Sequence, residues 1–318
     1  MTLVFFSGVR FNVACVNFEK RGYTMSDYIL TCGSTADLTK DYYTNSELPY
    51  IAFHYSIDGV EHNELDGSLS IEDFYSRMAN GSDTSTSQIN MMEFKDFFEP
   101  LAQTGKDIIH ICFSSGLTGT INSAISAAEE IMEEYPGIRI KVVDSLSASS
   151  GYGLLMDSIV EKRDSGYSFD ELVDYAEKER TRIQHWFYST DLTFYKKGGR
   201  ISAASYAVGT LLNIVPIMTV TYEGKLEVVE KERGRKKALK NVIEKMRKLA
   251  DGGENYNGKC YISHAGCLEE AQTLATAVEE AFPNLKEPVS VFDIGTVIGS
   301  HTGPGTVALF YHGAEREI

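Results

Sequence analysis

The sequence from Asp107 to Thr120 reads DIIHICFSSGLTGT, and this stretch indicates the class of fold. Its first part, Asp107 to Phe113, is an almost wholly apolar run, which is typical of a strand that is covered on both faces. Its second part, Ser114 to Thr120, is a polar turn with two glycines. The helix predicted after it has an apolar stripe with spacings of three and four, made of Ile121, Ala124, Ile125, Ala128, Ile131 and Met132. Strand, turn and helix in this order form a βα unit, which predicts a parallel sheet.

Similar units lie on both sides of this stretch. Three further strands are predicted, at Tyr28 to Thr31, Leu48 to Tyr55 and Ile138 to Val143. Ser70, with Asp73 three residues later, predicts a capped helix whose apolar face carries Phe74 and Met78. We therefore expect the first half of the chain to be a parallel sheet sandwiched by helices.

The pattern changes after Gly166. Ser168 and Glu171 have the spacing of a capping box at the start of a helix. The turn Glu223-Gly224 lies between two strand-like segments and predicts a hairpin. The strands expected in this half are Trp186 to Ser189, Ile214 to Tyr222, Lys225 to Val229, Lys259 to Ser263 and two near the C-terminus. Together with helices they predict a mixed sheet.

The fold class is thus α/β, and the 318 residues predict two α/β domains. We expect an N-terminal domain at residues 25–165 and a C-terminal domain at residues 166–318. Residues 1–24 are apolar and aromatic, but Arg10 interrupts them and no small-residue cleavage site follows. We interpret them as an upstream start or a disordered extension, with a signal peptide as the alternative.

The overall charge limits the classes of partner. Subtracting 45 acidic residues from 30 basic residues gives −15, which opposes general binding of nucleic acid. No apolar run reaches the roughly 18 residues that a transmembrane segment needs. The five cysteines form no CxxC pair, so no metal site is predicted and a cytoplasmic location is expected.

Four polar, glycine-rich or hydroxyl-rich segments are candidates for a site. They are Ser114 to Thr120, Thr84 to Gln88, Lys196 to Ser202 and Ile298 to Gly305. The first would leave amide groups uncovered at a helix start, which favours an anion such as a carboxylate or a phosphate. The last encloses His301 in a constrained loop, where it could donate to an anion or act as a base. Each segment taken alone is also compatible with an ordinary surface turn.

A basic segment, Lys231 to Lys248, stands out in this acidic chain. Nine basic residues minus two acidic ones give a local charge of +7. It is either a solvated helix face or a surface that docks to an acidic partner. Nucleic acid is the weaker interpretation, because the rest of the surface would repel it.

Taken together and in order, the motifs resemble those of the DegV family, the bacterial fatty-acid-binding proteins that include the FakB subunit of fatty acid kinase. The resemblance runs from about Met25 to Phe310. The motifs that carry it are STADL at Ser34 to Leu38, TSQ at Thr86 to Gln88, SSGLTGT at Ser114 to Thr120, DS at Asp144-Ser145, KGGRIS at Lys197 to Ser202, IVPIM at Ile214 to Met218, RGRKKAL at Arg233 to Leu239 and IGSHTGPG at Ile298 to Gly305.

The resemblance implies that two α/β domains clamp one long-chain fatty acid, such as palmitate or another chain of about 14 to 18 carbons, whose tail is buried in an apolar tunnel. It also implies which residues hold the carboxylate: Thr86, Thr118, where the family usually has Ser, and His301. Ser115, Arg200 and Arg233 are implied to lie near the carboxyl end or the partner. That partner would be a separate fatty acid kinase subunit, which phosphorylates the bound fatty acid for phospholipid synthesis.

The protein itself is then expected to be a carrier with no catalytic residue and no cofactor, and it has no GxxxxGK[ST] loop. An alternative is a hydrolase acting on an acyl ester through Ser114 or Ser115 with His301, although no GxSxG elbow is present. A third possibility is a binding module for another acidic amphiphile. The chain departs from the family at Cys32-Gly33, where the family's first strand usually ends in Thr-Asp before Ser-Thr-Ala-Asp.

Overall fold

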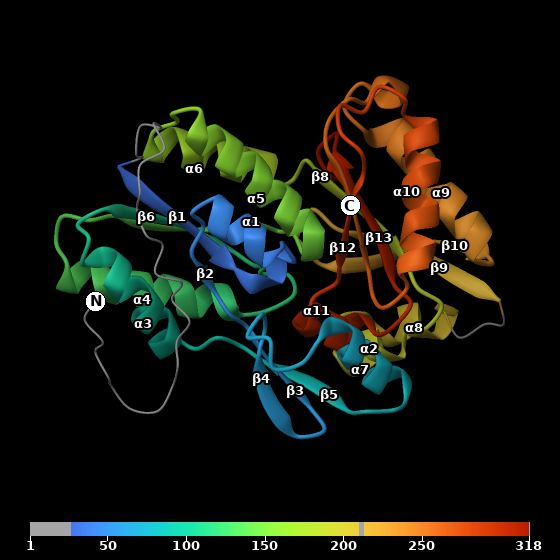
Figure 1. Cartoon of the computed structure of the whole chain (residues 1–318), viewed down its shortest axis with the longest axis horizontal. Coiled ribbons are helices and arrows are strands. Elements are labelled where there is room, and N and C mark those ends of the chain that lie inside the picture. Colours follow the sequence, from blue (N-terminus) through green and yellow to red (C-terminus); the bar gives the residue numbers. More distant parts are fainter. Residues whose placement is uncertain (1–26, 210–212, 318) are drawn as a thin grey trace.

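The computed structural model describes residues 27–209 and 213–317 and arranges them around three β-sheets (Figure 1). The segment that the sequence predicts to be a leader, residues 1–24, lies outside the described residues.

The four-stranded sheet belongs to the first half of the chain, and all of its strand pairs are parallel. Its order is β2-β1-β6-β7, with β1 (Tyr28–Gly33), β2 (Tyr50–Ile51), β6 (Asp107–Cys112) and β7 (Ile140–Asp144). Two helices lie on each face: α3 (Met91–Ala102) and α4 (Thr120–Glu134) on one, α5 (Ser149–Asp164) and α6 (Phe169–Glu179) on the other. The parallel sheet between helices is confirmed.

The six-stranded sheet belongs to the second half, and its order is β10-β9-β8-β13-β11-β12. Its strands are β8 (Ile183–Tyr188), β9 (Ile214–Val220), β10 (Leu226–Arg233), β11 (Cys260–His264), β12 (Ser290–Asp293) and β13 (Val307–His312). Only β11 and β12 pair in parallel, so the sheet is mixed, as predicted. Helices α9 (Arg235–Leu249) and α10 (Leu268–Ala281) pack on one face, and α5 packs against β8, β11 and β13. Helix α5 therefore lies between the two large sheets, and its first twelve residues are buried.

A small third sheet joins the two halves. It has the order β4-β3-β5, with β3 (His54–Ile57), β4 (Val60–Asn63) and β5 (Thr84–Ser87). The prediction of one strand from Leu48 to Tyr55 is wrong, because β2 pairs with β1 while β3 pairs with β4 and β5. Helices α2 (Ile71–Ala79) and α7 (Thr193–Lys197) contact α11 (Thr296–Thr302), which also packs on β3 and β5. The remaining elements are α1 (Lys40–Asn45), α8 (Ala203–Gly209), η1 (Ser34–Ala36) and η2 (Gly253–Asn255).

Local signals in the sequence identify helix starts well. The Ser70 hydroxyl accepts a hydrogen bond from the Asp73 amide at 3.1 Å, and Ser168 forms the predicted capping box with Glu171. One position in the α4 stripe is wrong, because Ile125 is 40% exposed. The buried positions of that helix include Ala124, Ala127, Ala128 and Ile131, so the apolar stripe passes through Ala127 rather than Ile125.

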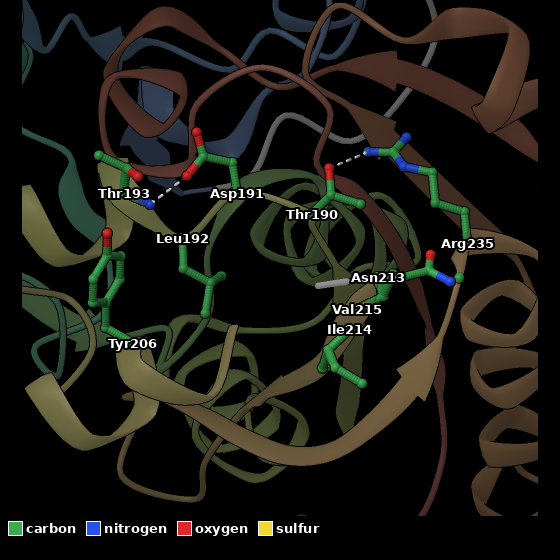
Figure 2. Close-up of a pocket in the computed structure, with 10 residues that line it drawn as sticks. Thr190, Asp191, Leu192, Thr193, Tyr206, Asn213, Ile214, Val215 and Arg235 are labelled. Atoms are coloured by element: carbon green, nitrogen blue, oxygen red, sulfur yellow. Dashed lines mark hydrogen bonds between the residues drawn. The ribbon is translucent and has the colours of Figure 1, made fainter. Parts of the chain in front are cut away.

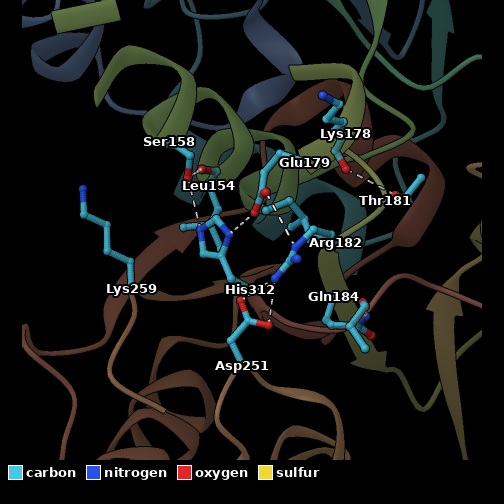
Figure 3. Close-up of polar contacts among 12 residues, drawn as sticks. Leu154, Ser158, Lys178, Glu179, Thr181, Arg182, Gln184, Asp251, Lys259 and His312 are labelled. Carbon is cyan, nitrogen blue, oxygen red and sulfur yellow. Dashed lines mark hydrogen bonds and ion pairs between the residues drawn. The ribbon is translucent and has the colours of Figure 1, made fainter. Parts of the chain in front are cut away.

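Polar contacts also attach α5 and α6 to the six-stranded sheet (Figure 3). The His312 ring, at the end of β13, lies with Nδ1 2.8 Å from Glu179 Oε1 of α6 and Nε2 3.1 Å from Ser158 Oγ of α5. Arg182 pairs with Asp251 at 2.7 Å beside this group. Helix α6 packs on β6 and β7 although it follows residue 165, and the division of the chain at residues 165 and 166 stays a prediction.

A buried carboxyl group, that of Glu64, holds helix α11 against the first half of the chain, and a second buried carboxyl group, that of Asp37, lies close to it. Glu64 accepts hydrogen bonds from the Val297 amide at 3.0 Å and from the Ser34 hydroxyl at 2.7 Å. Asp37 accepts from the Ser149 hydroxyl, and burial raises the pKa of both acids above their usual range. Helix α11 thus starts from a fixed point in the interior, which in turn fixes the position of the side chains along it.

Candidate functional site

A cavity of about 290 Å³ lies between the two halves of the chain. The six-stranded sheet contributes one apolar wall, made of Phe187, Val220, Leu226, Ala308 and Phe310. The first half of the chain and α11 contribute the other, made of Phe53, Phe113, Leu117, Ala148, Ile294, Val297 and Ile298. Most of the lining is therefore hydrocarbon, which suits an apolar ligand.

The strand register gives the direction of the cavity. Thr306, Ala308 and Phe310 line it at alternate positions, and residues of this spacing lie on one face of a strand. Ala308 pairs with Phe187, and Phe310 pairs with His185, which also lines the cavity. The five residues from Thr306 to Phe310 span about 13 Å at the usual rise of a strand. The cavity thus extends along β8 and β13.

Polar groups gather near the Thr306 side of this cavity. Thr86 comes from β5 and His301 from the last turn of α11, and Thr86 Oγ1 lies 2.7 Å from His301 Nε2. The sequence predicted His301 in a constrained loop, and this expectation is wrong because His301 lies in the helix α11. The hydroxyl-rich segment Thr84 to Gln88 places Thr86 in a strand that is paired with β3.

His301 is held in its neutral form. Burial and the nearby Arg200 guanidinium lower the pKa of His301 to about 4. Its Nδ1 has no hydrogen-bond partner among the described residues, and a side chain at Gly198 would collide with it. With the ring proton on Nε2, His301 donates to Thr86, and the Thr86 hydroxyl proton is free for an acceptor in the cavity.

Thr118 lies in the turn that leads into α4, and it also lines the cavity. Its Oγ1 is 2.9 Å from Thr120 Oγ1 and accepts from the Thr120 amide at 3.3 Å. The N-cap residue of this fifteen-residue helix, Gly119, provides no side-chain cap. The start of α4 therefore adds a partial positive charge on this side of the cavity, where an anion is favoured.

Arg200 completes the polar group. Its guanidinium donates to the Leu117 carbonyl at 3.1 Å and to the Gly198 carbonyl, and burial lowers its pKa. It forms no ion pair with any carboxylate in the part of the chain that the structure describes. A half-buried cation held only by carbonyl groups favours an anionic ligand, because such a charge is costly to desolvate without a counter-charge.

The structure thus brings together Thr86, Thr118, Arg200 and His301, but it places two other predicted residues outside the cavity lining. Ser115 is exposed, and its amide donates to Asp144 at 3.1 Å. Arg233 is exposed at the end of β10. Ser114, the other serine considered for a hydrolase, donates its hydroxyl to the Gly224 carbonyl at 2.8 Å. Neither Ser114 nor Ser115 hydrogen-bonds to His301 among the described contacts.

Several of the residues that line the cavity were not assigned to the site by sequence analysis. Gln88 lies beside Gly119 at the polar end, and it could have been inferred because it ends the TSQ motif. Phe53, Phe187 and Phe310 belong to the apolar walls, and no local signal distinguishes them from ordinary core residues. Their role follows only from the way in which the two halves pack.

A second pocket, of about 550 Å³, lies at the start of α9 (Figure 2). Its lining includes Thr190, Asp191 and Arg235, and Arg235 donates to Thr190 at 3.3 Å and forms an ion pair with Glu270. Its lining is polar as well as apolar, and its one cationic side chain already has a partner. It differs from the first cavity both in size and in the chemistry of its lining.

Other kinds of site find no support in residues 27–209 and 213–317. No group of His, Cys, Asp or Glu side chains there is arranged to hold a metal ion. Nor does any helix of this described part combine the length and the apolar character that crossing a membrane requires.

The chain matches a known family over nearly its whole length. The sequence profile of the family described as "Uncharacterised protein, DegV family" matches residues 30–313. A DegV domain-containing protein of Clostridium perfringens is 36% identical over 295 residues, which cover 92% of this chain and 100% of that protein.

Solved structures agree with this match. A DegV family protein from Thermus thermophilus, described by its fatty acid binding, is 27% identical and superposes with a TM-score of 0.80, covering 90% of this chain and 99% of that one. A DegV lipid-binding protein from Thermotoga maritima is 26% identical with a TM-score of 0.77, covering 91% and 99%.

The low pKa of His301 predicts how stability depends on pH. Between the ordinary histidine pKa of 6.5 and the folded value of about 4, the unfolded chain binds a proton that the folded protein does not. The wild type should therefore lose roughly 1–2 kcal/mol relative to a His301→Gln variant between pH 7 and pH 5. Urea unfolding of both proteins at the two pH values measures this. A constant difference between them would show that His301 is not held neutral.

Proposed function

The chain belongs to the DegV family, and from the geometry of its cavity we propose that it binds one long-chain fatty acid. The carboxylate lies among Thr86, Thr118, Arg200 and His301, and the tail extends along β8 and β13. The observation that carries this proposal is a cavity whose lining is mostly apolar and includes Arg200, a cation that has no carboxylate partner among the described residues.

The carboxylate and the acyl tail of the fatty acid contribute differently to the binding free energy. A carboxylate taken out of water is costly unless several donors meet it, and two hydroxyls, a guanidinium and a helix start can do so. Each buried methylene contributes about 0.8 kcal/mol, so ten of them give roughly 8 kcal/mol before ordering costs. Burial of the tail supplies most of the binding free energy, while the hydrogen-bond donors determine which part of the cavity holds the carboxylate.

We further infer that the protein presents this fatty acid to a separate kinase, which transfers the terminal phosphoryl group of ATP to the carboxylate. The chain has no GxxxxGK[ST] loop, and a separate partner that binds the phosphoryl donor is consistent with this. A cytoplasmic location, where ATP is available, fits this role and stays a prediction.

The basic surface on and before α9 is the part that we propose docks to that kinase. Some of its cations already have partners, since Lys245 pairs with Glu230 and Arg247 with Glu254. Arg233, Lys236 and Lys237 are exposed and have no carboxylate partner in the described structure. They flank Gly234 and Arg235 in the sequence, two residues that line the second pocket, so an acidic surface on the kinase would meet positive charge close to a concave surface.

Denaturing mass spectrometry of the purified protein tests the ligand. We expect about one equivalent of a co-purified fatty acid of about 14 to 18 carbons, since a tail of this size fills an apolar cavity best. Extraction that yields only water-soluble metabolites would contradict the proposal.

Thr118→Val tests one of the carboxylate contacts. This change keeps the shape of the side chain but removes a donor to a charged acceptor, so affinity for palmitate should fall by roughly 1.5–3 kcal/mol. Titration of delipidated protein with palmitate measures it. Thr276→Val, at an exposed position of α10, is the matched control and should bind as the wild type does. Equal affinity of the Thr118 variant would remove this residue from the site.

Charge reversal tests the kinase surface. Lys236→Glu combined with Lys237→Glu should lower the rate of acyl phosphate formation by a fatty acid kinase at least about tenfold at low salt. The lipid content of the variant should not change. Lys286→Glu, which alters an exposed lysine before β12, is the control. An unchanged rate for the double variant would place the kinase elsewhere and leave the lipid proposal standing.

A further inference from the structure

The tip of the β9–β10 hairpin, Val220 to Leu226, reaches from the second half of the chain to the first. The Gly224 carbonyl in its turn accepts a hydrogen bond from the Ser114 hydroxyl at 2.8 Å. A Cβ atom at Gly116 would lie only 2.6 Å from the Glu223 carbonyl oxygen, closer than such atoms approach in proteins. The hairpin tip therefore rests directly on the turn that leads into α4.

This contact connects the two walls of the cavity. Val220 and Leu226 pair across the hairpin at the base of its tip, and both line the cavity. Phe113 and Leu117 are the residues directly before and after Ser114 to Gly116, and they line the cavity from the first half of the chain. Separation of the tip from the turn would thus open the wall of the cavity between these two pairs.

The hairpin tip extends past the strand that supports it. In the described strands, β8 pairs with β9 only from Ile217 to Thr219, and β10 lies at the edge of the six-stranded sheet. Within the sheet, the segment from Val220 to Leu226 is therefore held by the pairing of its two ends with each other. Movement of this segment does not require β8 to leave its place.

A break in the strand pairing separates the tip from the anchored part of the hairpin. The register of β10 on β9 shifts between Val228 and Glu230, and a bulge of this kind interrupts the ladder and bends the strand. Beyond the bulge, Asn241 of α9 donates to Glu230 at 2.7 Å and to Glu232 at 3.1 Å. Helix α9 thus holds β10 on one side of the bulge, and the hairpin tip lies on the other.

The attachment of the tip to the first half is small. Tyr222 is 54% exposed, and the exposed side chains of Glu223 and Lys225 pair with each other at 2.6 Å. Among residues 27–209 and 213–317, the hydrogen bond from Ser114 is the only one that joins the tip to the first half. Segments with few buried side chains and few hydrogen bonds to their surroundings open at a low cost in free energy.

We propose that the hairpin tip is a strap that opens to admit and release the ligand, and that the Ser114–Gly224 hydrogen bond is its latch. This inference rests on the proposed fatty acid binding and goes beyond it by naming the segment through which the ligand passes. A pocket that buries most of its ligand admits it only when part of the wall moves. The strap is a part of the wall that lies beyond a bulge and is latched by one hydrogen bond.

Ser114→Ala removes the latch and tests the proposal through rates. Dissociation and association of palmitate should both become roughly two- to tenfold faster, because the net strength of one hydrogen bond corresponds to a factor of this size. The Kd should equal that of the wild type, since neither Ser114 nor Gly224 lines the cavity and a gate changes both rates equally. Exchange of bound radiolabelled palmitate against excess unlabelled palmitate gives the dissociation rate, and equilibrium titration gives the Kd. The association rate is their ratio.

Gly116→Ala loosens the strap by a different route. The added methyl group would meet the hairpin backbone and lift the tip, while the backbone of Gly116 is outside the left-handed region and accepts alanine. This variant should also speed both rates at an unchanged Kd. Glu223→Ala is the matched control, because it alters the same tip but removes only the exposed pair with Lys225. Its rates should be those of the wild type.

Thermal unfolding shows which variants are folded, and either of the two loosened variants is sufficient for the test. Unchanged exchange in a folded variant without the latch or with the added methyl group overturns the proposal. A faster dissociation without an equally faster association also overturns it, because that result describes a weakened site rather than a gate. Failure of the wild type to bind palmitate would instead contradict the proposed function.

Discussion

The hydrogen bond between Thr86 Oγ1 and His301 Nε2 joins residues 215 positions apart in the sequence, and the rest of the site is arranged around it. Thr86 is fixed by the pairing of β5 with β3, and His301 is fixed because Glu64 holds the start of its helix. Burial, together with the nearby Arg200, lowers the pKa of His301 and keeps the ring neutral. One short contact therefore orients a hydroxyl donor toward the cavity without adding a second buried charge.

The apolar part of the cavity depends on a different constraint, the alternation of side chains along a strand. Residues of β8 and β13 that face the first half of the chain are phenylalanine, alanine and histidine, while the opposite face packs on α9 and α10. Helix α5 occupies the space between the sheets and lines the cavity near His185 through Ala148 and Ser149, the residues at its start. A tail in this space meets hydrocarbon on both sides, which is where its affinity would arise.

Much of this arrangement could be predicted from the sequence. The features that could not be predicted all depend on contacts between segments that are distant in the sequence. Periodicity and capping residues predicted the βα unit at Asp107–Thr120, the helix starts at Ser70 and Ser168, and the mixed sheet. The resemblance to the DegV family implied that Thr86, Thr118 and His301 hold the carboxylate and that Arg200 lies near it or near the partner, and all four residues line one cavity.

Contacts between distant segments were not predictable. The buried pair Asp37 and Glu64 and the separate sheet of β3 to β5 both depend on packing that no local pattern encodes.

The crystal structure of the protein as purified tests the account most directly. The account predicts continuous elongated density along β8 and β13, with a forked end about 3 Å from Thr86 and Thr118. Separate water molecules in the cavity, or a forked end beside His185, would contradict it.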